Sequence, residues 1–126
     1  MSQRTPLARV RGLGSAKGGT EHFWMQRVTA VANVFLVCFL IGLMLALAGA
    51  DHATVKRALA RPEIAIPLLL LVLSGVVHMR LGMQTIIEDY VHSEGRKVAA
   101  LMLNSFFAIL VGITCVFAVL KLSFGV

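Results

Sequence analysis

The ionisable residues His78 and Arg80 lie within an otherwise uncharged apolar block that runs from Ile64 to Ile87. An ionisable residue inside a membrane span is costly and is by default a functional candidate. A neutral imidazole there can hydrogen-bond a neighbouring helix, relay a proton, or bind a metal or haem iron. Arg80 lies about 200° around a helix from His78, so we expect it to snorkel to the membrane edge or to form an ion pair.

The surroundings of His78 leave two interpretations open. Ser74 and Gly82 lie four residues to either side and would share a helical face with His78. Small residues let a second helix approach closely, and they equally leave room for a flat macrocycle. The other three histidines lie outside the apolar blocks: His22, His52 and His92. A haem with two histidine ligands would therefore take its second ligand from another chain.

A polar cluster, Glu88, Asp89 and Tyr90, follows directly after the same block. Acidic residues at a helix C-terminus oppose the helix dipole, so we expect a cation nearby, and Arg27 is predicted at the same depth. One interpretation is a solvated cluster at the membrane edge, where Tyr90 and Trp24 serve as aromatic anchors. The other is a quinone pocket. There Tyr90 would donate to a carbonyl, Asp89 would hold Tyr90 or relay protons, and Arg27 would stabilise developing negative charge or lower the pKa of Tyr90.

Three apolar blocks of 23 or 24 residues must position these side chains: 28–50, 64–87 and 98–120. A spanning helix needs about 20 apolar residues, and backbone polar groups in lipid must be satisfied within the helix. Of the 126 residues, 58% are hydrophobic and 14% are charged. We therefore predict an all-α integral membrane protein, a single domain over 1–126. A basic segment, 1–24, precedes antiparallel neighbouring helices at about 25–50, 63–90 and 97–121.

The basic residues predict how the chain crosses the membrane. Seven of them fall in the N-terminal segment, at the start of the first helix and in the second loop, and four in the first loop and at the C-terminus. The excess predicts a cytoplasmic N-terminus and a periplasmic C-terminus. Because the net charge of +6 is explained by this placement, we do not expect nucleic-acid binding. Cys38 and Cys115 lie within the blocks and match no metal-ligand spacing.

The stretch from His78 to Val91 resembles the second-helix signature of the smaller hydrophobic anchor of succinate dehydrogenase (respiratory complex II). In that family a haem-ligating histidine is followed, eleven and twelve residues later, by an Asp-Tyr pair at the quinone site. The intervals from His78 to Asp89 and Tyr90 match. The segment 24–30 resembles the family's N-terminal segment, in which an arginine, here Arg27, opens the first helix.

The resemblance implies a function for each matched residue. His78 would be one axial ligand of a b-type haem, whose other ligand would come from the larger anchor subunit. Tyr90 would hydrogen-bond a ubiquinone carbonyl, and Asp89 and Arg27 would support it. Electrons from succinate would arrive through a flavoprotein and an iron–sulfur subunit on the cytoplasmic face. This chain would be an enzyme subunit without its own flavin, cluster or succinate site. The motif is nearest to alphaproteobacterial forms, and we expect the protein in a bacterial cell inner membrane.

Other interpretations stay open on the residues alone. In one of them, the chain is an unrelated small b-type cytochrome or a haemless anchor of a quinone complex. A structural or small transporter-like membrane protein is a third class. Polar residues in the first and third helices are too scattered to line a pore: Asn33, Asn104, Ser105 and Thr114. Arg80 departs from the family pattern, because that position is often uncharged in relatives.

Overall fold

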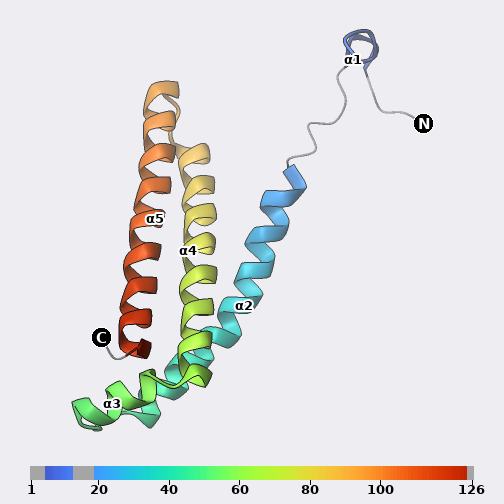
Figure 1. Cartoon of the computed structure of the whole chain (residues 1–126). Coiled ribbons are helices and arrows are strands. Elements are labelled where there is room, and N and C mark those ends of the chain that lie inside the picture. The colour runs from blue at the N-terminus through green and yellow to red at the C-terminus, as the bar shows by residue number, and fades with distance from the viewer. Residues whose placement is uncertain (1–4, 13–18, 125–126) are drawn as a thin grey trace.

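A computed structural model describes residues 5–12 and 19–124. Within them the chain forms five helices: α1 (Pro6–Val10), α2 (Gly19–Ala46), α3 (His52–Leu59), α4 (Pro62–Tyr90) and α5 (Glu94–Phe124). Three of these, α2, α4 and α5, are long and apolar enough to cross a membrane. The predicted all-α fold with three spanning helices is thus confirmed (Figure 1). Arg4 and Lys17, which enter the orientation prediction, lie outside the described residues.

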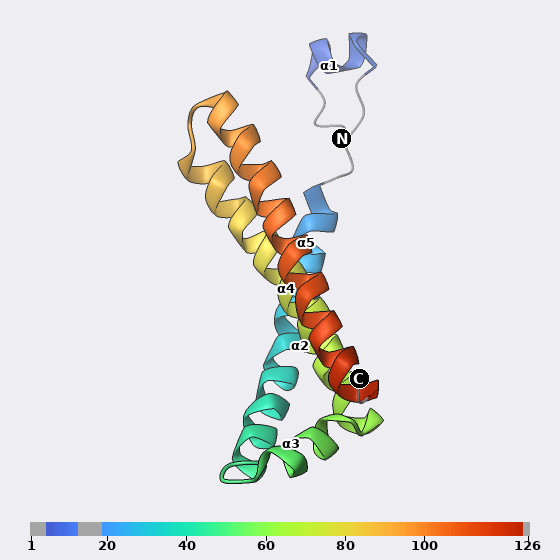
Figure 2. The same cartoon turned by 60° about the vertical axis from the view of Figure 1, so that its left-hand side comes forward.

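Helix α4 is the centre of the arrangement. It packs against α2 on one side and α5 on the other, and within the described residues α2 and α5 do not pack on each other. Helix α5 runs beside α4, whereas α2 crosses α4 and leaves it towards the end that carries Tyr90 (Figures 1 and 2). Consecutive spanning helices are therefore antiparallel neighbours, as predicted. The chain is an open layer of three helices rather than a closed bundle.

The two helix interfaces are marked by the two buried polar residues of the described chain. Thr29 is 7% exposed and lies between α2 and α4, and Asn104 is 8% exposed and lies between α4 and α5. The buried apolar residues of the described chain are small in number: Ala65, Ile87 and Ala108. Most large apolar side chains point outward, so lipid or helices of other subunits must cover them.

The loop between α2 and α4 differs from expectation. Helix α2 ends at Ala46, four residues before the predicted end, and Gly49 follows with a φ of 79°, which favours glycine. The loop then forms α3, which was not predicted. Asp51 caps α3 by accepting a hydrogen bond of 3.2 Å from the amide of Ala53. Pro62 opens α4, where its missing N–H has no helical partner to lose.

Candidate functional site

The imidazole of His78 faces α2 at the crossing of the two helices. Its Nδ1 lies 3.1 Å from Oγ1 of Thr29. One turn earlier on α4, the hydroxyl of Ser74 donates to the backbone carbonyl of Thr29 at 3.4 Å. Two polar side chains of α4 therefore hold one residue of α2, deep within the two spans. Thr29 was not among the predicted site residues.

Thr29 belongs to a polar stripe on α2, defined by His22, Gln26, Thr29 and Asn33. The spacing of four, three and four residues keeps these side chains on one helical face. Three buried atoms of this stripe have no hydrogen-bond partner among the described residues: Nε2 of His22, Oε1 of Gln26 and Oδ1 of Asn33. A buried polar atom without a partner is costly, above all in a membrane. A bound group or another subunit is therefore expected to complete this stripe.

A groove of about 450 Å³ lies between α2 and α4 beside this stripe. It is lined by His22, Phe23, Gln26, Arg27, Gly82, Thr85 and Ile86. Gly82 allows the close approach, because a Cβ there would stand 3.3 Å from Nε2 of Gln26. The guanidinium of Arg27 lies over the ring of Phe23, 4.7 Å from its centroid.

Tyr90 lies in a different groove, at the turn between α4 and α5. This groove has a volume of about 320 Å³ and is lined by Tyr90, Val91, His92, Arg96 and Ala100. Tyr90 is 77% exposed, and within the described residues neither its hydroxyl nor the Asp89 carboxylate has a hydrogen-bond partner. Both groups are thus free to meet a ligand or another subunit.

The helix register separates Arg27 from Tyr90. Thr29 faces His78 and Gln26 faces Gly82, so Arg27 lies across from Arg80 and Leu81. Tyr90 is nine or ten residues further along α4, which is about 14 Å of helix. The guanidinium of Arg27 extends from this backbone position towards Phe23 and shares a groove with Thr85 and Ile86. That Arg27 lies at the depth of Asp89 and Tyr90 stays a prediction.

The cation expected beside the acidic end of α4 is not Arg27. The ion pair that the described residues form joins Arg61 to Glu63, at the opposite end of α4. Glu88 instead accepts a hydrogen bond of 2.8 Å from Nε2 of Gln84. The positive side chain that shares a groove with Tyr90 is Arg96, from the first turn of α5.

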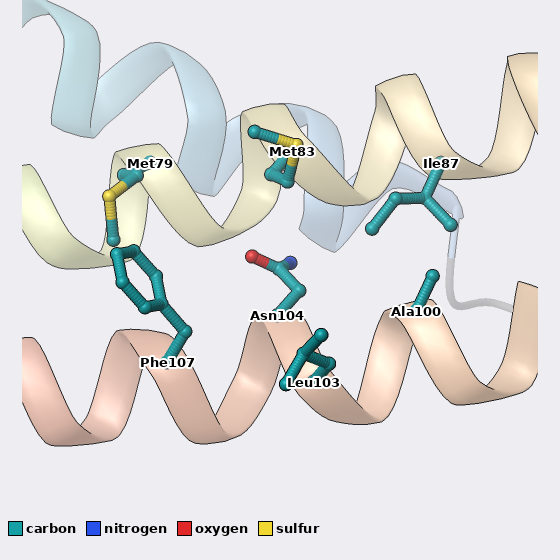
Figure 3. Close-up of a pocket in the computed structure, with 7 residues that line it drawn as sticks. All are labelled: Met79, Met83, Ile87, Ala100, Leu103, Asn104 and Phe107. Atoms are coloured by element: carbon teal, nitrogen blue, oxygen red, sulfur yellow. The ribbon is translucent and has the colours of Figure 1, made fainter.

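A third groove lies between α4 and α5, with a volume of about 400 Å³ (Figure 3). It is almost wholly apolar: Met79, Met83, Ile87, Ala100, Leu103, Asn104 and Phe107. Asn104 donates from Nδ2 to the carbonyl of Arg80 at 3.0 Å and so ties α5 to α4. The side chain of Arg80 is exposed, as snorkelling requires.

The described residues contain no group of three or more His, Cys, Asp or Glu side chains that could hold a metal ion. The candidate iron ligand among them is the imidazole of His78 on α4. A haem bound here by two histidines would need a ligand from outside the described chain.

Comparison with known proteins identifies the family. The model for the family "Succinate dehydrogenase/Fumarate reductase transmembrane subunit" matches residues 1–114. The chain belongs to this family. It is accordingly an integral membrane protein, and its curated relatives are subunits of succinate dehydrogenase.

Among these relatives, the succinate dehydrogenase hydrophobic membrane anchor subunit of Rickettsia bellii is 33% identical over 116 residues, which cover 92% of this chain and 93% of the relative. The subunit of the same name from Paracoccus denitrificans is 31% identical over 121 residues, or 96% and 93% of the two chains. The succinate dehydrogenase membrane anchor subunit of Reclinomonas americana is 29% identical over 96 residues, or 74% and 80%. No solved structure gives a significant match.

Proposed function

We propose that this chain is the smaller membrane-anchor subunit of a succinate:quinone oxidoreductase, and that it supplies one axial ligand to a b-type haem and part of the ubiquinone-reduction site. The observation that carries the proposal is the position of His78. Its Nδ1 is engaged by Thr29, while its Nε2 has no partner among the described residues. A histidine held through one ring nitrogen and free at the other is the arrangement of a ligand.

The surroundings of His78 fit a haem. A Cβ added at Gly75, three residues before His78 on α4, would meet no atom within 4 Å, so a flat group can lie against the helix there. Buried polar atoms of His22 and Gln26 lack partners on the neighbouring stripe of α2. The iron would be held by His78 of this chain and by a histidine of the second anchor subunit, and the haem would supply one-electron storage.

Tyr90, Asp89 and Arg27 are the residues of this chain that we assign to ubiquinone. The free hydroxyl of Tyr90 would donate to a quinone carbonyl, and the exposed carboxylate of Asp89 would pass protons towards it. Reduction to quinol takes two electrons from succinate and two protons. His78 and Tyr90 are twelve residues apart, or about 18 Å of helix, so haem and quinone would lie at different depths.

Arg27 would act on this site without touching Tyr90. The register separates their backbones by about 14 Å along α4, and the two side chains line different grooves. Its charge would therefore reach the quinone from the groove between α2 and α4, or through bound water, rather than through the phenol. Arg96, which shares the groove of Tyr90, is a second cation that would favour negative charge there.

The remaining parts of the enzyme would come from partner subunits. A flavoprotein and an iron–sulfur protein would dock on the cytoplasmic face, where the basic N-terminal segment and second loop would meet them. The second hydrophobic anchor subunit would cover the exposed apolar sides of α2 and α4. The site of action would be the inner membrane of a bacterium, with the N-terminus in the cytoplasm and the C-terminus in the periplasm.

The proposal is tested by isolating the complex through a tag on this chain and identifying the subunits that accompany it. We expect a flavoprotein, an iron–sulfur protein and a second hydrophobic subunit, with succinate-dependent reduction of ubiquinone. Purification with a different quinone-linked enzyme, or of this chain without a flavoprotein, would contradict the assignment.

A further inference from the structure

The hydroxyl of Thr29 lies between two hydrogen-bonding groups, and it carries a single proton. On its own helix, Oγ1 is 2.7 Å from the carbonyl oxygen of Met25 and 3.3 Å from that of Gln26. Across the interface, the same Oγ1 is 3.1 Å from Nδ1 of His78. A hydroxyl can donate one hydrogen bond and accept two, so the position of its proton decides what the imidazole must do.

The hydroxyl proton of Thr29 lies in the hydrogen bond to the carbonyl oxygen of Met25. A separation of 2.7 Å is the usual length of an O–H···O hydrogen bond, and a carbonyl oxygen has no proton to contribute. Without the hydroxyl proton between them, the two oxygens would face each other at that distance with no bond to hold them. The helical back-bond of a threonine to the carbonyl four residues earlier is also a common geometry.

Once the hydroxyl donates to Met25, its oxygen can only accept from His78. Nδ1 of the imidazole must therefore carry the proton, which fixes the neutral ring in one tautomer. The unprotonated nitrogen is then Nε2, which has no hydrogen-bond partner among the described residues. The same hydrogen bond sets the rotation of the ring about its bond to Cβ.

We infer that Thr29 is a positioning residue, which holds His78 in the Nδ1–H tautomer and so presents Nε2 as an iron ligand. This inference rests on the proposed haem site. Ser74 assists, because its hydroxyl donates to the carbonyl of Thr29 and so holds that residue against α4. The structure assigns this task to the hydroxyl of Thr29, a residue that is 7% exposed, and within the described residues this hydroxyl has no other partner across the interface.

Loss of the hydroxyl has two measurable consequences. Outer-shell partners of a ligating histidine contribute about 10- to 100-fold in metal affinity, because they orient the ring and raise its basicity. When the imidazole becomes less basic, ferric iron loses more stabilisation than ferrous iron does. The midpoint potential of the haem therefore rises. A tenfold loss of affinity confined to the ferric form corresponds to a rise of about 59 mV.

The test uses the intact complex and three variants of this chain. Thr29→Val removes the hydroxyl at nearly constant volume, and Thr29→Ser retains it. Thr114→Val is the matched control, because Thr114 makes the same back-bond in α5, to the carbonyl of Leu110 at 2.8 Å, and has no histidine partner. Haem content per complex and the haem midpoint potential are measured for each variant.

We expect Thr29→Val to lose haem on dilution and to raise the midpoint potential, while Thr29→Ser and Thr114→Val behave as wild type. Wild-type haem content and potential in Thr29→Val would overturn the inference, as would a Thr29→Ser variant as impaired as Thr29→Val. Should Thr29→Val not assemble, Thr29→Ala is measured in the same way with the same two outcomes.

The failure of the inference is distinguishable from the failure of the proposed function. If haem is lost in His78→Ala but unaltered in Thr29→Val, the role of Thr29 is refuted and the proposed function is not. If the wild-type complex has no haem, or has haem that does not depend on His78, both the proposed function and the role of Thr29 are refuted.

Discussion

The replacement of Tyr90 by phenylalanine separates a role in quinone reduction from a role in the fold. The side chain is 77% exposed, and its hydroxyl has no hydrogen-bond partner among the described residues. Removal of the hydroxyl therefore breaks no hydrogen bond among the described residues and leaves no buried polar group without a partner. Any functional loss must come from a group outside the described residues, and we propose that this group is the quinone carbonyl.

The expected size of the effect follows from one hydrogen bond. A neutral hydrogen bond contributes about 0.5 to 1.5 kcal/mol net, and each 1.4 kcal/mol corresponds to a factor of ten. Tyr90→Phe should thus lower kcat/KM for ubiquinone about 2- to 12-fold. The rate of succinate oxidation with a soluble artificial acceptor should not change, because that reaction does not use the quinone site.

The assay compares succinate–ubiquinone and succinate–soluble acceptor activity in the same purified complex. Trp24→Phe is the control, because it removes the polar group of another exposed aromatic side chain, near the start of α2, and should alter neither rate. An unchanged ubiquinone rate in Tyr90→Phe would refute the proposed hydrogen bond. An equal loss in both assays would instead show that Tyr90 supports assembly of the complex.

Three further outcomes follow from the structure. Arg27→Gln should slow ubiquinone reduction and spare the soluble-acceptor rate, and a shifted haem spectrum with unchanged ubiquinone kinetics would move Arg27 from the quinone to the haem. Gly82→Leu should weaken assembly, because a Cβ at Gly82 already meets Gln26 at 3.3 Å. Gly42→Ala, where an added Cβ meets no atom within 4 Å, should leave the yield of complex unchanged, and equal yields of the two variants would refute this. Asp51→Ala should speed amide exchange in α3. In the wild type, the hydrogen bonds from Thr54 and the backbone lower the pKa of Asp51, so its cap is complete at neutral pH and is lost only as the pH falls through that lowered pKa. Equal exchange of α3 in Asp51→Ala and the wild type at neutral pH would contradict this.

The spans could be predicted from composition, because block length and the absence of charge are local properties that a membrane imposes directly. Helix α3 could not be predicted in the same way. Its eight residues are short and mixed in character, and its start depends on the cap that Asp51 forms. The end of α2 was predicted too late, because Leu47 and Ala48 are apolar even though the chain turns before Gly49.

The candidate site was predicted only in part. The arrangement of its residues within α4 follows from their spacing on one helix, whereas the pairing of α2 residues with α4 residues does not. The spacing of His78, Asp89 and Tyr90 along α4 is visible in the sequence. The partner of His78 depends on the register between two helices, and that register is set by Thr29 against His78 and by Gln26 against Gly82. For the same reason the offset between the backbones of Arg27 and Tyr90 could not be predicted. The spacing of the polar stripe on α2 was the one sequence signal that pointed to Thr29.

The central claim is that His78 binds a haem in the assembled complex. The most direct measurement is the reduced-minus-oxidised absorption spectrum of the purified complex, taken for the wild type, His78→Ala and His52→Ala. His52 is exposed at the start of α3 and serves as the control. The account predicts a b-type haem spectrum in the wild type and in His52→Ala, and its loss in assembled His78→Ala. An unchanged spectrum in His78→Ala would contradict it.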